Sequence, residues 1–231
     1  MKLSLVVFAL AALLLSFCAP AAAIEWVRLG PKGGIHYSKV SGGYTYADSD
    51  FSVDEGWTSK QGVGLGLFFN IGLNKYLSIQ PEFSFAVKGT KGEFAVAFED
   101  VSGVGEYNFR LDYWEFPLLL KVTCPTGLFF VPFVTAGPYI GFNSKADREA
   151  YFTPRGGNRD GVKADMAEEI TSYDYGVAIG GGIDFSIGES IMIFAEARYQ
   201  LGFANIREEV DDLKNRSLSF TAGFSLPVYP R

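Results

Sequence analysis

An alternation of apolar and small or polar residues, sustained over long stretches, constrains the fold of this chain most strongly. The segment VGLGLFFNIGLNKYLSIQPEFSFAVKG, residues 63–89, places Val, Leu, Phe and Ile on one parity, and mainly Gly, Ser, Asn, Glu and Lys on the other. A period of two residues predicts β-strands rather than helices. Asn74, Lys75 and Tyr76 interrupt the pattern and predict a short hairpin connection between two strands.

The same alternation recurs along the rest of the chain and predicts eight strands in total. They fall near residues 27–39, 63–73, 77–88, 114–122, 128–142, 172–185, 190–203 and 217–228; the segment 128–142 is apolar on both parities, so its register stays open. The connections alternate between short ones (NKY, CPTG, IGES) and long ones at residues 41–60, 89–108, 143–171 and 204–215. This layout predicts an all-β fold, an eight-stranded antiparallel up-and-down transmembrane β-barrel with its long loops at one end.

The chemistry of the two parities indicates which face of the barrel is outside. In a soluble, lipocalin-like carrier the apolar parity would face inward, and the surface in contact with water would consist of Gly, Ser and Ala with few charged residues. Soluble proteins normally have many more charged residues on their surface. With the apolar parity outward, Leu, Ile and Phe meet lipid while Gly and Ser fit a narrow lumen. We therefore expect outer-membrane lipid and lipopolysaccharide around the wall, and aromatic girdles near the strand ends from Trp26, Trp57, Tyr76, Tyr113, Trp114 and Tyr173.

The first 23 residues have the pattern of an export signal. One early Lys precedes an apolar stretch, and Ala21 and Ala23 form an A-x-A cleavage box, so we predict a signal peptide at 1–23 and a barrel domain at 24–231. A transmembrane helix is the alternative, and the short apolar run disfavours it. Lipidation of Cys18 is disfavoured by the bulky Phe17 before it, and removal of Cys18 leaves only Cys124, so no intrachain disulfide is expected.

The charge of the chain excludes one class of partner. The formal net charge is −6 and the isoelectric point is about 4.9. A nucleic-acid-binding protein needs a basic face, so no nucleic-acid partner is expected.

Charged residues on the small, lumen-facing parity are the predicted site residues: Glu82, Lys88, Glu115, Lys121, Glu196 and Arg198. Opposite charges inside a narrow barrel can pair and fill it, because an unpaired charge away from water is costly. The functional alternative is a proton or ion path through the same residues, although an eight-stranded barrel has room for little beyond its own side chains.

Two further constellations allow other chemistries. His36, the only histidine, lies two residues from Ser38, as a lipid hydrolase would need, but no Gly-x-Ser-x-Gly elbow accompanies the pair. Asp48, Asp50, Asp54 and Glu55 could hold calcium, yet the turn glycine of an EF-hand would fall at Val53, and a solvated acidic loop is the simpler interpretation. We therefore predict no catalytic, cofactor-binding or metal-binding residues.

Five segments resemble the PorT-like outer-membrane β-barrel family of the Bacteroidetes: GPKGGIHYSKV, LSIQPEFSFAVKG, YWEFPLLLKV, VPFVTAGPYIGF and AEARYQLGFANI. The resemblance spans essentially the whole chain after the signal, and it implies an eight-stranded outer-membrane barrel. The founding member of the family assists a secretion system, and this role carries over only weakly. The ending LPVYPR departs from the usual pattern because it lacks a terminal Phe.

These observations predict a non-catalytic integral outer-membrane protein with long extracellular loops. Its role would be structural or interactive, with protein partners meeting the loops, as an accessory of envelope assembly or protein secretion. A small-solute pore is the competing interpretation, and an outer-membrane lipid hydrolase or a soluble carrier is a weaker one.

Overall fold

A computed structural model describes residues 24–41, 58–98, 101–127, 129–165, 170–188, 190–206 and 213–229. The predicted signal segment with Cys18, and the acidic loop with Asp48, Asp50, Asp54 and Glu55, lie outside these ranges. Nine strands make up the described fold: β1 (Trp26–Ser41), β2 (Thr58–Gly72), β3 (Leu77–Phe98), β4 (Val101–Thr123), β5 (Phe130–Pro154), β6 (Asp160–Asp165), β7 (Tyr173–Ile187), β8 (Ile191–Gly202) and β9 (Lys214–Tyr229). In the described ranges no helix is long and apolar enough to span a membrane.

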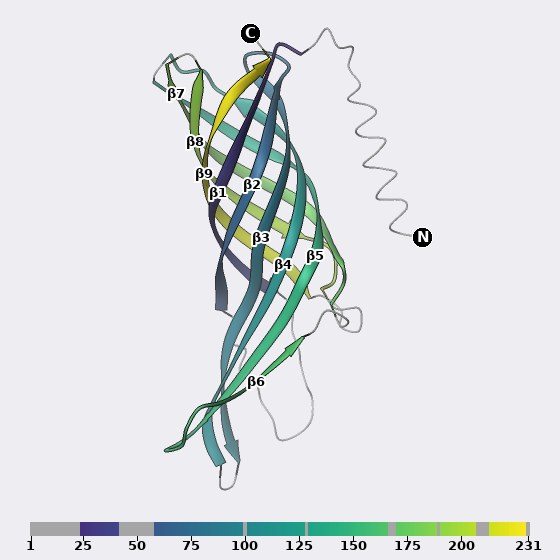
Figure 1. The fold of residues 1–231 in the computed structure, drawn as a ribbon, viewed down its shortest axis with the longest axis vertical. Coiled ribbons are helices and arrows are strands. Elements are labelled where there is room, and N and C mark those ends of the chain that lie inside the picture. Colours follow the sequence, from purple (N-terminus) through teal and green to yellow (C-terminus); the bar gives the residue numbers. More distant parts are fainter. Residues whose placement is uncertain are drawn as a thin grey trace, which may run out of the picture.

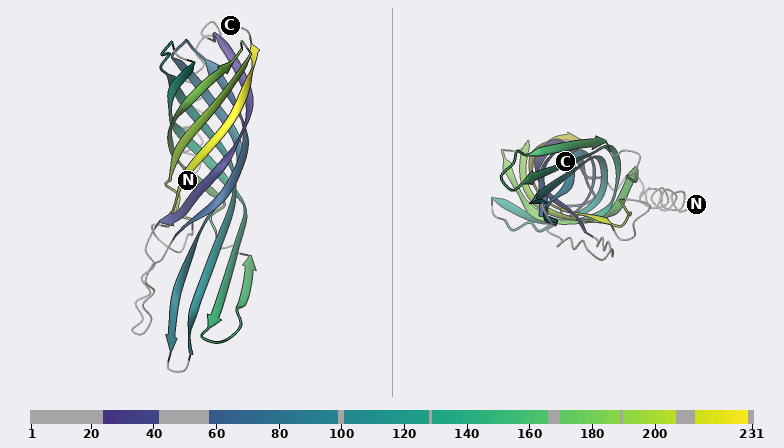
Figure 2. Two further views of the ribbon diagram at one scale, coloured as in Figure 1. Left: turned by 90° about the vertical axis from the view of Figure 1, so that its left-hand side faces the viewer. Right: turned by 90° about the horizontal axis from the view of Figure 1, so that it is seen from below.

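Eight of these strands close into a ring, as the alternation predicts. Each strand pairs antiparallel with its neighbours in the order β1-β2-β3-β4-β5-β7-β8-β9, and β9 returns to β1. Figures 1 and 2 show the strongly tilted strands wrapped around a narrow axis, with both ends of the described chain at the same end of the barrel. The tight connections lie at that end too, which makes it the periplasmic end of an outer-membrane barrel.

Two of the predicted long loops are largely strand, which corrects the expectation from sequence. β3 and β4 continue as an antiparallel ladder to the pair Phe98–Val101, so most of the predicted loop 89–108 is a hairpin. β5 likewise continues to Pro154, and β6 pairs back onto it. The extension follows from its composition, since β-branched and aromatic residues are frequent between Thr90 and Phe109 and favour strands. The result is a sheet of β3, β4, β5 and β6 that projects beyond the ring (Figure 1).

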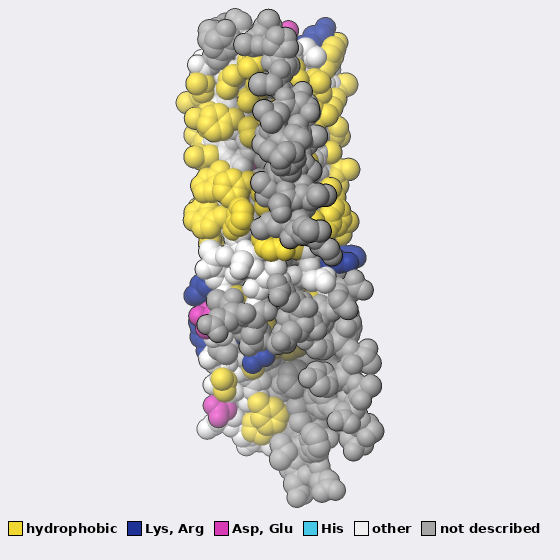
Figure 3. All heavy atoms as spheres, turned by 90° about the vertical axis from the view of Figure 1, so that its right-hand side faces the viewer, with side chains coloured by type: hydrophobic (Ala, Val, Ile, Leu, Met, Phe, Trp, Pro, Cys, Tyr) yellow, Lys and Arg dark blue, Asp and Glu magenta, His cyan; other side chains and the backbone are white. Residues whose placement is uncertain are grey.

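The two faces of the ring differ sharply in chemistry. Along β8, and along β2 from Gln61 to Gly72, the residues of one parity are mostly exposed and those of the other are mostly buried. Exposed apolar side chains occur on every strand of the ring and form a belt. On the face that Figure 3 shows, they gather over the ring, and charged atoms appear beyond the lower edge of the belt. The apolar parity therefore faces outward. Among the predicted girdle residues that the structure describes, Tyr113 is an exception, because it points into the lumen and is 1% exposed. Trp57 lies outside the described residues.

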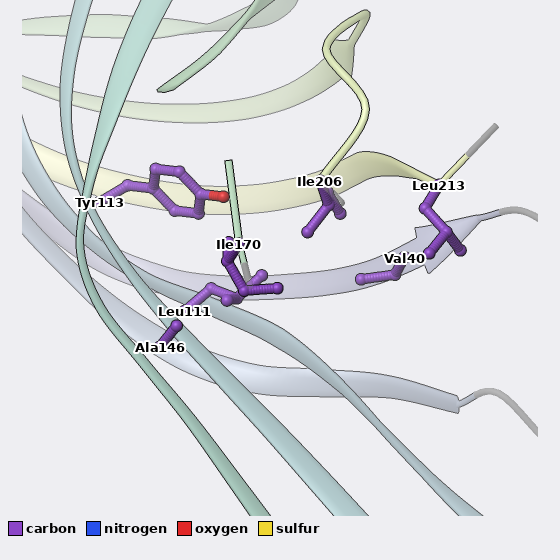
Figure 4. Close-up of a cluster of buried hydrophobic side chains, with 7 residues drawn as sticks. All are labelled: Val40, Leu111, Tyr113, Ala146, Ile170, Ile206 and Leu213. Carbon is purple, nitrogen blue, oxygen red and sulfur yellow. The ribbon is translucent and has the colours of Figure 1, made fainter. Parts of the chain in front are cut away.

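The lumen is closed by apolar side chains at both ends. Phe68, Phe133 and Phe194 form a buried cluster near the periplasmic end. At the extracellular mouth a second cluster joins residues from three strands and two connecting segments (Figure 4): Val40, Leu111, Tyr113, Ala146, Ile170, Ile206 and Leu213. Between the two clusters the inward-facing residues are mainly charged or polar.

Candidate functional site

A charge network centred on Arg198 occupies the middle of the lumen. The Arg198 guanidinium donates hydrogen bonds to both carboxylate oxygens of Glu82 at 2.6 and 2.8 Å, and to Glu196 at 2.7 and 3.2 Å. Lys32 adds a second cation, with its Nζ atom 2.5 Å from Glu82 Oε2. Thr135 donates to Glu196 at 2.7 Å. Two cations and two carboxylates thus balance one another and share hydrogen bonds, which is the arrangement that makes buried charges tolerable.

Two further ion pairs extend the network along the axis. Lys88 lies 2.5 Å from Glu115, whose other oxygen accepts a hydrogen bond from Gln200 at 3.2 Å. Toward the periplasmic end, Lys121 pairs with Asp184 at 2.8 Å and lies over the ring of Phe133. Lys88 and Glu115 lie on the neighbouring strands β3 and β4, whereas the Gln200–Glu115 hydrogen bond and the Lys121–Asp184 pair each join two strands that are not neighbours in the ring.

All six predicted lumen residues are buried inside the barrel and all six are paired. Sequence reasoning left out two partners, Lys32 and Asp184, although both lie on the predicted inward parity. It also left out Asp174, which accepts hydrogen bonds from Tyr139 and Asn215 at 3.1 Å near the mouth. Alternation alone would have found these residues, but their charge partners come from strands that are distant in sequence.

Very little space remains inside the ring. Among the described residues, the lumen holds small cavities of about 20 Å³ beside His36 and about 10 Å³ beside Phe133. A cavity needs roughly 10–15 Å³ to hold one water molecule. The first cavity can therefore take about one water, and no continuous channel follows from these volumes.

A much larger cavity lies outside the ring, against the projecting sheet. It measures about 1030 Å³ and is lined by β2, β3, β4, β5 and the segment before β6, with these residues: Thr58, Ser59, Lys60, Gln61, Lys91, Gly92, Glu93, Glu106, Tyr107, Asn108, Glu149, Tyr151 and Arg159. Arg159 crosses the cleft, pairing with Glu106 at 2.6 Å while it lies 4.0 Å from the centre of the Tyr151 ring. The cleft thus offers aromatic, amide and charged groups of both signs on a sheet that projects from the barrel.

The sequence model of the outer membrane protein beta-barrel domain family matches residues 24–208. The chain belongs to this family. It is therefore a β-barrel protein of the bacterial outer membrane, and the apolar belt is its lipid-facing wall.

Several solved structures are similar to this chain at low sequence identity. Ail of Yersinia pestis is 15% identical over 87% of this chain and all of its own, with a TM-score of 0.38. Neisserial surface protein A is 12% identical over 86% of this chain and 96% of its own, with a TM-score of 0.45. OprG of Pseudomonas aeruginosa is 12% identical over 89% of this chain and 97% of its own, with a TM-score of 0.43. No curated protein sequence matches the chain.

In this outer-membrane barrel, His36 and Ser38 lie on the lumen side of β1 and are both buried. The Ser38 hydroxyl donates a hydrogen bond to the Gly89 carbonyl at 3.1 Å and accepts one from the Gly89 amide at 2.9 Å. Gly89 has a φ of 139°, a conformation that side chains rarely adopt, so glycine is needed at this link between β1 and β3. The hydroxyl is thus committed to the backbone rather than to the imidazole.

Charged side chains also organise the projecting sheet. Lys145 donates to Asp147 at 2.9 Å, and Lys163 lies 3.9 Å from the same carboxylate. The hydrogen bond from Lys145 is the main reason why the pKa of Asp147 lies below its ordinary value, and the charges of Lys145, Lys163 and Arg110 add to it. In the described residues, no group of three or more His, Cys, Asp and Glu side chains is placed to hold a metal ion.

Proposed function

We propose that this outer-membrane barrel is a non-catalytic anchor whose projecting extracellular sheet meets other proteins. Its role would be accessory, in envelope assembly or protein secretion. The sequence motifs of residues 77–89, 113–122 and 195–206 support a place among the PorT-like members of the family. One observation supports the proposal above all. In the described part of the chain, the lumen is filled by side chains and has no room for a ligand, whereas the projecting sheet outside it has a large cleft where another protein could bind.

The filled lumen disfavours the small-solute pore. A conducting barrel needs a continuous wet path, and here ion pairs lie between two apolar plugs, with cavities of about 20 and 10 Å³. The hydrolase alternative needs a hydroxyl activated by a base, and Ser38 is held by Gly89 instead. A His36→Ala variant should therefore leave outer-membrane lipid turnover unchanged.

The test is cross-linking in intact cells followed by pull-down, with the full chain and with a shortened chain. The shortened chain lacks residues 92–107 and joins Lys91 to Asn108, which lie opposite each other on β3 and β4. The proposal predicts specific cross-linked proteins that are lost in the shortened chain although it is still inserted. Partners that persist after the deletion would contradict it.

The matched control keeps the sheet but changes the lumen. Glu196→Gln alters the charge network of the lumen and leaves every lining residue of the cleft in place. Its cross-linked partners should equal those of the unchanged chain, provided that equal amounts of folded barrel are compared.

A further inference from the structure

Two cations face each other on the outer wall, at the extracellular edge of the apolar belt. Lys39 of β1 lies directly opposite Arg216 of β9, and both side chains are exposed while their chain neighbours Ser38, Val40, Asn215 and Ser217 are buried. Side chains of directly opposed residues point to the same face of a sheet, so both cations point outward. Like charges in this position destabilise a strand pair unless an anion lies between them.

Three other cations on the extracellular side of the belt have partners in the protein. Arg110 pairs with Asp112 at 2.9 Å, Lys145 with Asp147 at 2.9 Å, and Lys163 with Glu149 at 3.4 Å. Lys39 and Arg216 pair with no carboxylate in the described ranges of the chain. Within the described part of the chain, their charges are therefore open to an anion that comes from outside the protein.

Below the cation pair, the same strands form an apolar column that ends in a groove. The cross-strand rows of β1, β9 and β8 run from Tyr37–Leu218–Tyr199 through Ile35–Phe220–Ala197 to Gly33–Ala222–Ala195. Large side chains at the top give way to small ones, and a groove of about 660 Å³ opens among Gly33, Ile183, Ala195, Ala197, Phe220 and Ala222. The groove lies in the lipid-facing wall, so its occupant is hydrocarbon.

The distance from the cations to the groove suits a single amphiphile. Arg216 and Ala222 lie on the same strand, six residues apart, which corresponds to roughly 20 Å at about 3.4 Å per residue. A molecule with an anionic head and an acyl chain of that reach would place the head between Lys39 and Arg216 and the chain in the groove.

We infer that this face is a binding site for the phosphorylated lipid anchor of lipopolysaccharide. Lys and Arg both bind phosphate through charge-assisted hydrogen bonds. The cations lie at the extracellular edge, so the lipid belongs to the outer leaflet. The site is independent of the role of the projecting sheet, because neither cation lines the large cleft.

The test is a titration of the folded, detergent-solubilised barrel with the purified lipid anchor, followed by native mass spectrometry. Lys39→Gln/Arg216→Gln should weaken binding about 25-fold, about fivefold for each cation removed. Ala195→Leu/Ala222→Leu should weaken binding by filling the groove; both side chains point to lipid, so the barrel should still fold. The control Arg110→Gln/Lys145→Gln removes two cations that already have partners, and it should bind as the unchanged chain does.

Titrations with different ligands separate the contribution of the anionic head from that of the acyl chain. The dephosphorylated lipid anchor should bind at least tenfold more weakly, and inorganic phosphate at millimolar concentration should not displace the phosphorylated form. Equal binding by the dephosphorylated anchor, or by the Lys39→Gln/Arg216→Gln variant, would overturn the inference. So would equal affinity for a phosphatidylethanolamine, whose head carries no net charge.

Discussion

Arg198 and Glu82 join opposite walls of the barrel. Arg198 lies on β8 and Glu82 on β3, four strands apart in a ring of eight, and two hydrogen bonds of 2.6 and 2.8 Å join them across the lumen. They are separated by 116 residues in sequence. Side-chain pairs thus span the interior of the barrel and fill it, instead of leaving an open passage.

Breaking this brace should destabilise the barrel strongly. Arg198→Leu leaves Glu82 and Glu196 buried with Lys32 as the nearby cation, and removal of one partner from a buried ion pair costs about 3–5 kcal/mol. The free energy of unfolding should fall by that amount, measured by urea unfolding in lipid vesicles. The control Arg159→Gln removes the exposed partner of Glu106 and should cost less than about 1 kcal/mol.

A double-mutant cycle separates the pair from its surroundings. Glu82→Gln/Arg198→Gln removes both charges, so its loss of stability should be smaller than the sum of the two single losses. If the losses simply add, the two residues do not act as a pair.

The filled lumen should not conduct ions. Planar bilayers containing the purified barrel should show no steps of open-channel current, because the apolar plugs at both ends exclude water. Phe133→Ala, which opens the periplasmic plug, should remain silent because the charge network still fills the middle. Stable single-channel steps from the unchanged chain would refute the account of the lumen.

The projecting sheet should be dispensable for the stability of the ring. The ladders that close the ring, such as β1–β9 and β8–β9, do not involve residues 92–107. The shortened chain that joins Lys91 to Asn108 should therefore keep the gel mobility shift on heating that folded barrels show. A shortened chain that runs as unfolded without heating would mean that the sheet helps the ring to form.

Acid should loosen the projecting sheet through Asp147. Its pKa lies below the ordinary value of 3.8, so ionised Asp147 stabilises the folded sheet above that pH, and the stabilisation disappears as the pH falls through the folded pKa. Amide hydrogen exchange in β5 and β6 should be faster in Asp147→Asn than in the unchanged chain at pH 7. The difference should shrink as the pH falls below 3.8 and through the lowered pKa of folded Asp147, and a difference that stays constant would rule out a role for the charge.

The sequence predicted the ring well because alternation is a local property. The parity of Glu82, Glu115 and Arg198 follows from their own neighbours, and the structure buries all three. The pairing of Lys121 with Asp184 depends on which strands face each other across the lumen, which one sequence does not state. The sheet beyond the ring was missed because Gly-rich segments such as residues 102–105 resemble loops, although their backbone continues the ladder of β4.

The most direct test of the central claim is fluorescence quenching by lipids brominated along their acyl chains. Trp114 points outward and is 41% exposed, whereas Phe133 points into the lumen and is 5% exposed. In a background with Trp26 and Trp57 replaced by Phe, Trp114 should be quenched strongly. In the same background, a Phe133→Trp/Trp114→Phe variant should be quenched weakly. Stronger quenching of the lumen-facing tryptophan than of Trp114 would contradict a wall that faces lipid with its apolar side chains.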